Sequence, residues 1–336
     1  MNTPGLVKCA GALLALAMCS ACWSSAGAPS AAALSARYVG RTLFVNGKPV
    51  TAARVNLSPL RRSATTVPDR DLDSRTFEYV INDYGTYAGI FKYPNSDKEI
   101  GKITNVGGQG CTNVLYGYGK KIFWIVAAFN QITEYTILKK PLKTLSDSVG
   151  MPSSCAMNTS GDLAVGILNG SGAGDVVIYK NASGSGTVYT TPLASEFFDG
   201  YDSQGNLFAD GFSSASGFRL VELPKGGTKF QTIATSNSVQ FPGSVQWDGK
   251  YVTVLDQLSN AIYQYTISGT NATLQGTVSF QGSSDCAQSW NVKNLVYCGD
   301  AGTNDGEVFK YPAGGSPVAT FTGGFDLPLG VVAVER

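Results

Sequence analysis

The residues of this chain best placed to do chemistry are short polar side chains that recur near the end of the second strand of a repeat. At that position a carboxylate or amide oxygen can accept hydrogen bonds from backbone N–H groups of the following turn. A residue that recurs in every repeat usually serves the repeat itself, so the sequence predicts that these side chains brace turns. The alternative is that some of them, together with Glu196, Asp199 or Asp285, bind Ca²⁺, which prefers oxygen ligands, at the mouth of an axial channel. The residues are Asp83, Asn169, Asp210, Asp256 and Asp300.

A second group combines acids and aromatic rings in one short segment, Glu196-Phe-Phe-Asp-Gly-Tyr201. Carboxylates beside rings are suited to binding a sugar or an apolar ligand at a channel opening. The alternative is that the rings pack between neighbouring sheets, as most large buried rings do. The ligand-binding hypothesis therefore concerns Glu196, Phe197, Phe198, Asp199 and Tyr201.

Histidine is absent from all 336 residues. This excludes Ser-His-Asp and Cys-His nucleophile activation, histidine general-base catalysis and histidine-zinc sites. The 25 basic and 24 acidic residues give a net charge of +1, so no strong field attracts nucleic acid. The sequence predicts no catalytic residue, no nucleic-acid partner and no cofactor apart from the Ca²⁺ alternative.

The N-terminus has the features of an export signal, which we assign to residues 1–22. A short region with Lys8 precedes an apolar run that is too short to span a bilayer. Cys19 and Cys22 each end a segment resembling an imperfect lipobox, so they are lipidation candidates; cleavage without lipidation is the alternative. Residues 23–37, rich in Ser and Ala, would form a linker. The sequence therefore predicts a protein that is secreted, periplasmic or lipid-anchored to the cell envelope.

A repeat of about 44 residues follows. An alternating strand that ends in an aromatic residue or Leu recurs six times, with spacings of 42, 44, 44, 42 and 46 residues. Each copy is preceded by two strands joined by a tight turn and followed by a fourth strand, which is the pattern of a β-propeller blade. The recurring positions are Tyr93, Tyr135, Tyr179, Leu223, Tyr265 and Tyr311.

The two ends of the repeat region complement each other. The first unit begins at a second strand, residues 77–83, whereas residues 326–335 match a first strand. The sequence therefore predicts an all-β, six-bladed β-propeller over residues 75–336, with four-stranded blades and a first blade closed by the C-terminal strand. Residues 38–74 form an N-terminal extension with a predicted hairpin about Asn46-Gly47.

Two segments of the repeat, DSQGNLFAD at residues 202–210 and DQLSNAIYQY at residues 256–265, resemble NHL-type and TolB-like six-bladed propellers of secreted bacterial proteins. The resemblance covers residues 75–336 and implies a fold more than an activity. The resemblance of the second segment supports the prediction that Asp256 braces the turn after its strand.

Four cysteines remain after the signal, an even number that favours disulfides in an oxidising compartment. Cys111 and Cys155 each lie 24 residues before a recurring Tyr, so we expect them to face each other on neighbouring blades. Cys286 and Cys298 flank one predicted turn, and a hairpin centred at residue 292 would place them opposite each other. The alternative is four buried free thiols.

These features predict an exported, non-catalytic propeller, a monomer that presents a binding face to a protein or small-molecule ligand. It would meet a membrane only through a lipid anchor. The alternative is a hydrolase or lactonase of gluconolactonase-like type that depends on a divalent metal.

Overall fold

The structure is a computed structural model that describes residues 36–39, 42–45, 48–50, 76–82, 87–93, 96–112, 122–127, 131–136, 141–145, 150–168, 174–213, 217–283, 285–322, 324–325 and 327–335. The predicted export signal, most of the linker, and the candidates Cys19, Cys22, Asp83 and Asn169 lie outside these ranges.

The regular secondary structure of the described chain is almost entirely β-strand; its one helical segment is the 3-10 turn η5 (Lys180–Ala182). A central strand such as β20 (Val252–Asp256) is buried along its whole length because other sheets cover both of its faces. An outer strand such as β22 (Asn271–Ser279) alternates exposed and buried residues because only one of its faces is covered.

The strands form four four-stranded sheets, one eight-stranded sheet and one small three-stranded sheet within the described ranges. The four-stranded sheets are as follows, each in its spatial order. They are β27 (Pro328–Glu335), β4 (Thr76–Asn82), β5 (Tyr87–Tyr93) and β6 (Ser96–Thr104); β7 (Gln109–Cys111), β8 (Ile122–Ala127), β9 (Gln131–Thr136) and β10 (Pro141–Leu145); β11 (Met151–Met157), β12 (Leu163–Leu168), β13 (Asp175–Tyr179) and β14 (Thr187–Thr190); and β23 (Cys286–Val292), β24 (Leu295–Asp300), β25 (Asp305–Lys310) and β26 (Gly314–Phe321).

The eight-stranded sheet consists of two four-stranded halves joined at their outer strands. A parallel pairing, Ala234↔Asn271 and Thr235↔Ala272, connects β18 (Gln231–Thr235) to β22. The first half also contains β15 (Ser195–Tyr201), β16 (Leu207–Ser213) and β17 (Gly217–Leu223), and the second also contains β19 (Pro242–Trp247), β20 and β21 (Ala261–Ser268).

The small sheet contains β1 (Ala36–Val39), β2 (Thr42–Val45) and β3 (Lys48–Val50). β2 pairs with β3 through Val45↔Lys48, which is the hairpin predicted about residues 46 and 47.

The recurring Tyr and Leu positions lie at equivalent places in these sheets, at or near the end of a third strand. Tyr93, Tyr135, Tyr179, Leu223 and Tyr265 lie on β5, β9, β13, β17 and β21, and Tyr311 directly follows β25.

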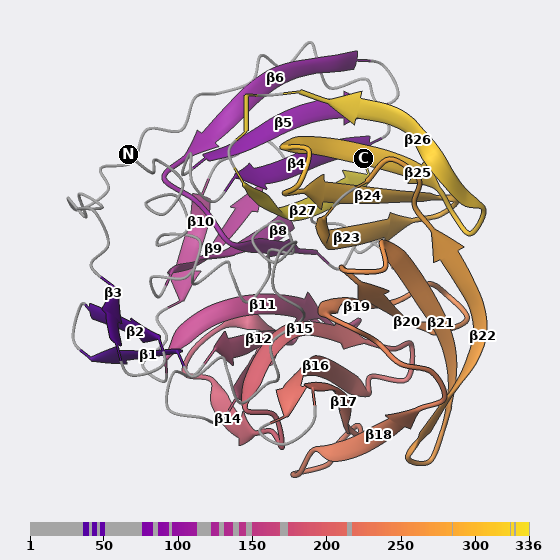
Figure 1. The fold of residues 1–336 in the computed structure, drawn as a ribbon. Coiled ribbons are helices and arrows are strands. Elements are labelled where there is room, and N and C mark those ends of the chain that lie inside the picture. The colour runs from indigo at the N-terminus through magenta and orange to yellow at the C-terminus, as the bar shows by residue number, and fades with distance from the viewer. Residues whose placement is uncertain are drawn as a thin grey trace.

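The C-terminal strand closes the fold. β27 pairs antiparallel with β4, from Pro328↔Asn82 to Glu335↔Thr76, so residues from both ends of the described propeller region share one sheet (Figure 1). The predicted pairing of the C-terminal strand with the first repeat is thus present. It covers the edge of β4 that would otherwise be open to pairing with another chain.

The four-stranded sheets and the two halves of the eight-stranded sheet are arranged around a common centre (Figure 1). One strand of each four-stranded sheet and of each half lies nearest that centre, and we call β7, β11, β15, β19, β23 and β27 the inner strands. Each inner strand contacts the next in this order, and β27 contacts β7, so they form a closed cycle.

Apolar clusters fill the wedges between successive sheets. For example, Phe91, Tyr297 and Val331 are buried in one cluster between the sheet of β23–β26 and the sheet of β27, β4, β5 and β6. Between β11–β14 and β15–β18, Ala164, Leu207 and Val221 share another. Each sheet is therefore held by apolar contact with both neighbours, and the inner strands are brought close enough for polar contacts.

Candidate functional site

The inner strands present backbone N–H groups on the edge that has no strand partner, and neighbouring side chains satisfy several of them. Gln288 of β23 is 4% exposed, and its Oε1 accepts hydrogen bonds from Gly110 N of β7 at 3.1 Å and from Val331 N of β27 at 2.9 Å. Its Nε2 donates to Gly110 O at 2.8 Å. One buried amide therefore connects three inner strands, because burying these backbone groups without partners would be costly.

Other inner strands use the same type of contact. Ser289 N donates to Ser244 Oγ at 2.7 Å, and Asn291 N donates to Gln246 Oε1 at 2.9 Å, so side chains of β19 bind the backbone of β23. Between β15 and β19 the backbones themselves approach closely. A Cβ atom on Gly200 would lie 2.2 Å from Val245 O, so this position requires glycine.

A disulfide joins β7 to β11. Cys111 and Cys155 are bonded, with their Cα atoms 5.7 Å apart, and both are buried. This confirms the pairing predicted from their equivalent positions in the repeat.

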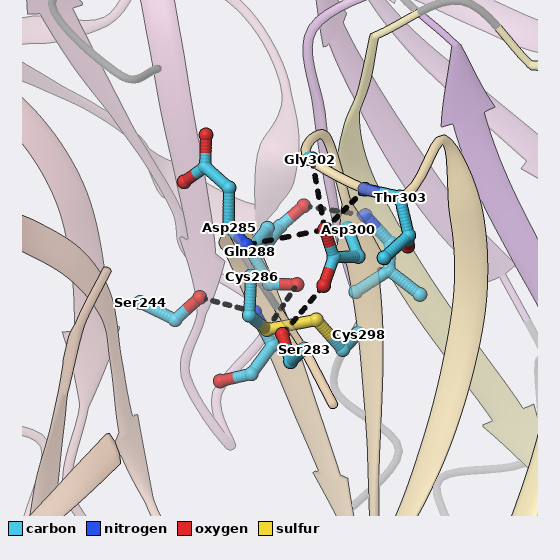
Figure 2. The surroundings of a disulfide bond; sticks show 11 residues. Ser244, Ser283, Asp285, Cys286, Gln288, Cys298, Asp300, Gly302 and Thr303 are labelled. Carbon is cyan, nitrogen blue, oxygen red and sulfur yellow. Dashed lines mark hydrogen bonds between the residues drawn. A yellow bond between two sulfur atoms is a disulfide. The ribbon is translucent and has the colours of Figure 1, made fainter. Parts of the chain in front are cut away.

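The second predicted pair, Cys286 with Cys298, is also bonded, but the predicted hairpin register is wrong (Figure 2). The turn lies at residues 293–294, and the strand partners are Cys286↔Asp300 and Ser289↔Cys298. A β-bulge between Cys286 and Gln288 adds one residue to β23, which brings the two cysteines to the same face as diagonal neighbours.

Both disulfides lead to a stability prediction. Replacing both cysteines of a pair by Ala should lower the free energy of unfolding by about 4 kcal/mol for Cys111–Cys155 and about 3 kcal/mol for Cys286–Cys298, because the closed loops span 44 and 12 residues. Denaturant unfolding of the two double variants measures the difference. A larger loss for Cys286–Cys298 would contradict the loop-entropy argument.

Two of the predicted turn-bracing residues make the contacts that this role requires. Asp256 Oδ1 accepts from Phe241 N and Ser259 N, at 3.2 and 3.3 Å. Asp300 Oδ1 accepts from Gly302 N and Thr303 N in the following turn, at 2.8 and 2.9 Å, and also from Asp285 N (Figure 2). Both residues therefore hold the turn to the third strand and the chain that enters the first strand of the same sheet.

Asp210 differs from this pattern. Its Oδ2 accepts from Gly243 N of the neighbouring inner strand at 3.2 Å, so it joins two halves of the eight-stranded sheet. Asp210 occupies the same place in the repeat as Asp256 and Asp300, but its carboxylate contacts the neighbouring half of the sheet. Asp210 pairs with Phe198 of β15 and lies beside β19.

The segment Glu196–Tyr201 lies in β15 and is mostly buried. Phe197 and Phe198 are 0% and 2% exposed and belong to one core cluster, where Phe197 packs edge-on against Phe212 and Phe241. Both rings therefore pack between sheets and offer no stacking surface. Tyr201 is partly exposed and packs against a different cluster.

The two acids of this segment meet the hydroxyl groups of β11. Ser153 Oγ donates to Glu196 Oε2 at 2.6 Å, and Ser154 Oγ lies 3.0 Å from Glu196 Oε1 and 2.9 Å from Asp199 Oδ2. Glu196 is 0% and Asp199 6% exposed. We call Ser153, Ser154, Glu196 and Asp199 the acid joint, because they connect β11 with β15.

Burial controls the acidity of this region. It raises the pKa of Asp199 to about 7 and the pKa of Glu196 well above its usual value, and the neighbouring Asp199 charge raises the latter further. Burial likewise raises the pKa of Asp210. Neither of the two ion pairs in the described ranges, Lys102–Glu99 and Lys143–Glu134, involves these acids.

Among the described residues, no three His, Cys, Asp or Glu side chains converge in a way that would hold a metal ion. What the acid joint can do chemically is exchange protons and hydrogen-bond across two sheets.

A further set of turn residues, which we did not predict from the sequence, lies on one face of the ring. Asn158, Asp202 and Asp248 each accept two backbone N–H bonds with one side-chain oxygen in the turn after an inner strand, for example Asp202 Oδ1 from Gln204 N and Asn206 N. The signal was present: Asn158 and Asp202 are each followed four residues later by a second Asp or Asn.

Comparisons with known proteins support the fold alone. No protein-family model and no curated protein sequence matches the chain. A solved protein of unknown function from Bacteroides caccae aligns with a TM-score of 0.57 and 11% identity, over 78% of this chain and all of that one. The solved nidogen/laminin complex aligns with a TM-score of 0.60 and 12% identity, over 77% of this chain and 98% of that one.

Together with the sheets around one centre, these likenesses define the class: the chain has an all-β, β-propeller fold. Its two disulfides are typical of exported proteins, and in the described part of the chain no helix is both long enough and apolar enough to cross a membrane.

Proposed function

We propose that this chain is an exported, non-catalytic, six-bladed β-propeller that binds a protein or small-molecule ligand through the loops on one face of the ring. The six blades are the four four-stranded sheets and the two halves of the eight-stranded sheet. The cyclic order of the inner strands and the repeat of about 44 residues support this count. The closer relationship to NHL-type and TolB-like propellers is part of the same proposal.

The observation that carries the proposal is the bonding at the centre of the ring. Gln288 connects three inner strands, and the acid joint lies between two blades, so these central polar groups are used in holding blades together. Turn residues such as Lys250 and Thr303 are exposed, and variable loops on a rigid scaffold are suited to recognition.

The disulfides and the predicted signal at residues 1–22 support export. We further propose that the mature chain is monomeric and, if Cys19 or Cys22 is acylated, anchored to the envelope by lipid. Mass spectrometry of the mature N-terminus distinguishes an acylated cysteine from simple cleavage.

A site-specific photo-crosslinking experiment tests the binding face. A photoreactive residue would replace Lys250 in the turn after β19, Thr303 in the turn after β24, or Val318 on the outer strand β26; all three are exposed. In cells, we expect a discrete crosslinked product at Lys250 or Thr303 and none at Val318. Equal products at all three positions, or none at any, would contradict a loop-face partner. Turnover of lactones or esters by the purified chain with Ca²⁺ would contradict the non-catalytic assignment.

A further inference from the structure

We propose that the acid joint holds a buried proton, shared by the carboxyl groups of Glu196 and Asp199 through the hydroxyl of Ser154, and that loss of this proton loosens the contact between β11 and β15. The joint is then a pH-sensitive connection between two neighbouring blades.

The count of hydrogens at Ser154 supports the proposal. A serine hydroxyl carries one hydrogen and can donate to one acceptor only. Ser154 Oγ nevertheless lies within hydrogen-bond distance of Glu196 Oε1 at 3.0 Å and Asp199 Oδ2 at 2.9 Å. If both carboxyl groups were ionised, one of these contacts would join two lone pairs. A proton on one carboxyl group resolves the conflict, because that group then donates to Ser154 while Ser154 donates to the other.

The confinement of Glu196 supports the same conclusion. A Cβ atom on Gly166 of β12 would lie 1.9 Å from Glu196 Oε2, so the carboxyl group sits directly against the neighbouring sheet. Gly174, before β13, abuts the Glu196 backbone in the same way. An ionised carboxylate in this position would be separated from water, and such burial without a cation is strongly unfavourable.

The side chains that act on the joint are acids and hydroxyls, and the backbone N–H of Gly166 also donates a hydrogen bond to Asp199. Asp199 on the same strand and Asp210 on β16 both raise the pKa of Glu196 through their charges, and Asp256 on β20 acts on Asp210. β11 contributes only Ser153 and Ser154 to the joint, and β13 begins with Asp175. Asp162 and Tyr189 lie near Tyr201 at the other end of β15.

The direction of the pH effect follows from the raised pKa values. In the unfolded chain the pKa of these carboxyl groups is about 4. In the folded protein the pKa of Asp199 is about 7, and the pKa of Glu196 is also raised. The folded state therefore holds more protons between these values, and its stability falls as pH rises through this window. Below about pH 4 both states are protonated and this contribution is fully present.

The test compares unfolding of the full chain across pH with three variants. We expect the wild-type unfolding equilibrium constant to rise with pH between pH 5 and pH 7, and each proton that the joint releases on unfolding should add about tenfold per pH unit to this slope. Glu196→Gln and Asp199→Asn should each reduce this slope, and the control Glu99→Gln, on a partly exposed strand residue, should leave it unchanged. An unchanged slope in both joint variants would overturn the proposal.

Infrared spectroscopy keeps the proposal testable if a variant does not fold. At pH 7 exposed carboxyl groups are ionised, so the carbonyl band of a neutral carboxylic acid reports buried protonated groups. Burial also raises the pKa of Asp210, and it raises the pKa of Glu307 to about 8, so these two acids contribute to the same band. Wild type should therefore show the band, and Glu196→Gln or Asp199→Asn should lose only the part that comes from the joint. Absence of the band in wild type, or an intact band in both folded variants, would overturn the proposal.

Discussion

Removal of residues 326–336 should abolish the folded monomer. β27 carries Leu329, Val331, Val332 and Val334, each at most 3% exposed. Burying such a side chain contributes about 1.5–3 kcal/mol, so these four alone represent about 6–12 kcal/mol, comparable with the whole stability of a typical domain. The truncation also exposes the edge of β4, which can then pair with other chains. Size-exclusion chromatography and circular dichroism should show aggregated or unfolded material.

A pair of point variants separates the closure from a general effect of mutation. Val332→Ala removes buried methyl groups from β27 and should cost about 2 kcal/mol, whereas Val318→Ala, on the outer strand β26 at 42% exposure, should change stability by less than about 0.5 kcal/mol. A truncated chain that stays monomeric with unchanged melting would contradict the closure of the ring by β27.

Replacement of Gln288 by Met should give the second largest loss, about 5 kcal/mol. Met keeps the length of the side chain but removes its polar atoms, so Gly110 N, Gly110 O and Val331 N lose their buried partner. Each buried backbone group left unsatisfied costs about 1–3 kcal/mol. Chemical denaturation measures the loss, and hydrogen exchange should show faster exchange of the Gly110 and Val331 amides in particular.

The matched control is Gln275→Met on the outer strand β22, where the side chain is exposed and bonds only a nearby carbonyl. Its effect should stay within about 0.5 kcal/mol. If the two substitutions cost the same, or if the Gly110 and Val331 amides exchange as in wild type, then Gln288 does not connect the inner strands.

The sequence was informative wherever a feature repeats at a fixed spacing. The Tyr and Leu positions marked the third strand of each sheet, and the equivalent positions of Cys111 and Cys155 were sufficient to predict their disulfide. The match of residues 326–335 to a first strand predicted its pairing with β4. Such features can be recognised in the sequence because every blade has the same arrangement of strands and a similar length, so equivalent residues recur at a nearly constant spacing.

The polar contacts between blades could not be predicted in this way, because they depend on where one residue is inserted into a strand. In a regular strand Glu196 and Asp199 would point to opposite faces. The bulge between Glu196 and Phe198 brings both acids to Ser154, just as the bulge between Cys286 and Gln288 brings Cys286 to the face of Cys298.

The sequence by itself thus determined the repeat, the β-propeller class and the closing strand, and it predicted the two disulfides with free thiols as the alternative. Only the tertiary structure decided that Phe197 and Phe198 belong to the core, that Glu196 and Asp199 meet Ser154, and that Gln288 connects three inner strands. The physical reason is that alternation along a strand gives two faces, whereas the neighbour that each face meets is set by the bulges and by the closure of the ring.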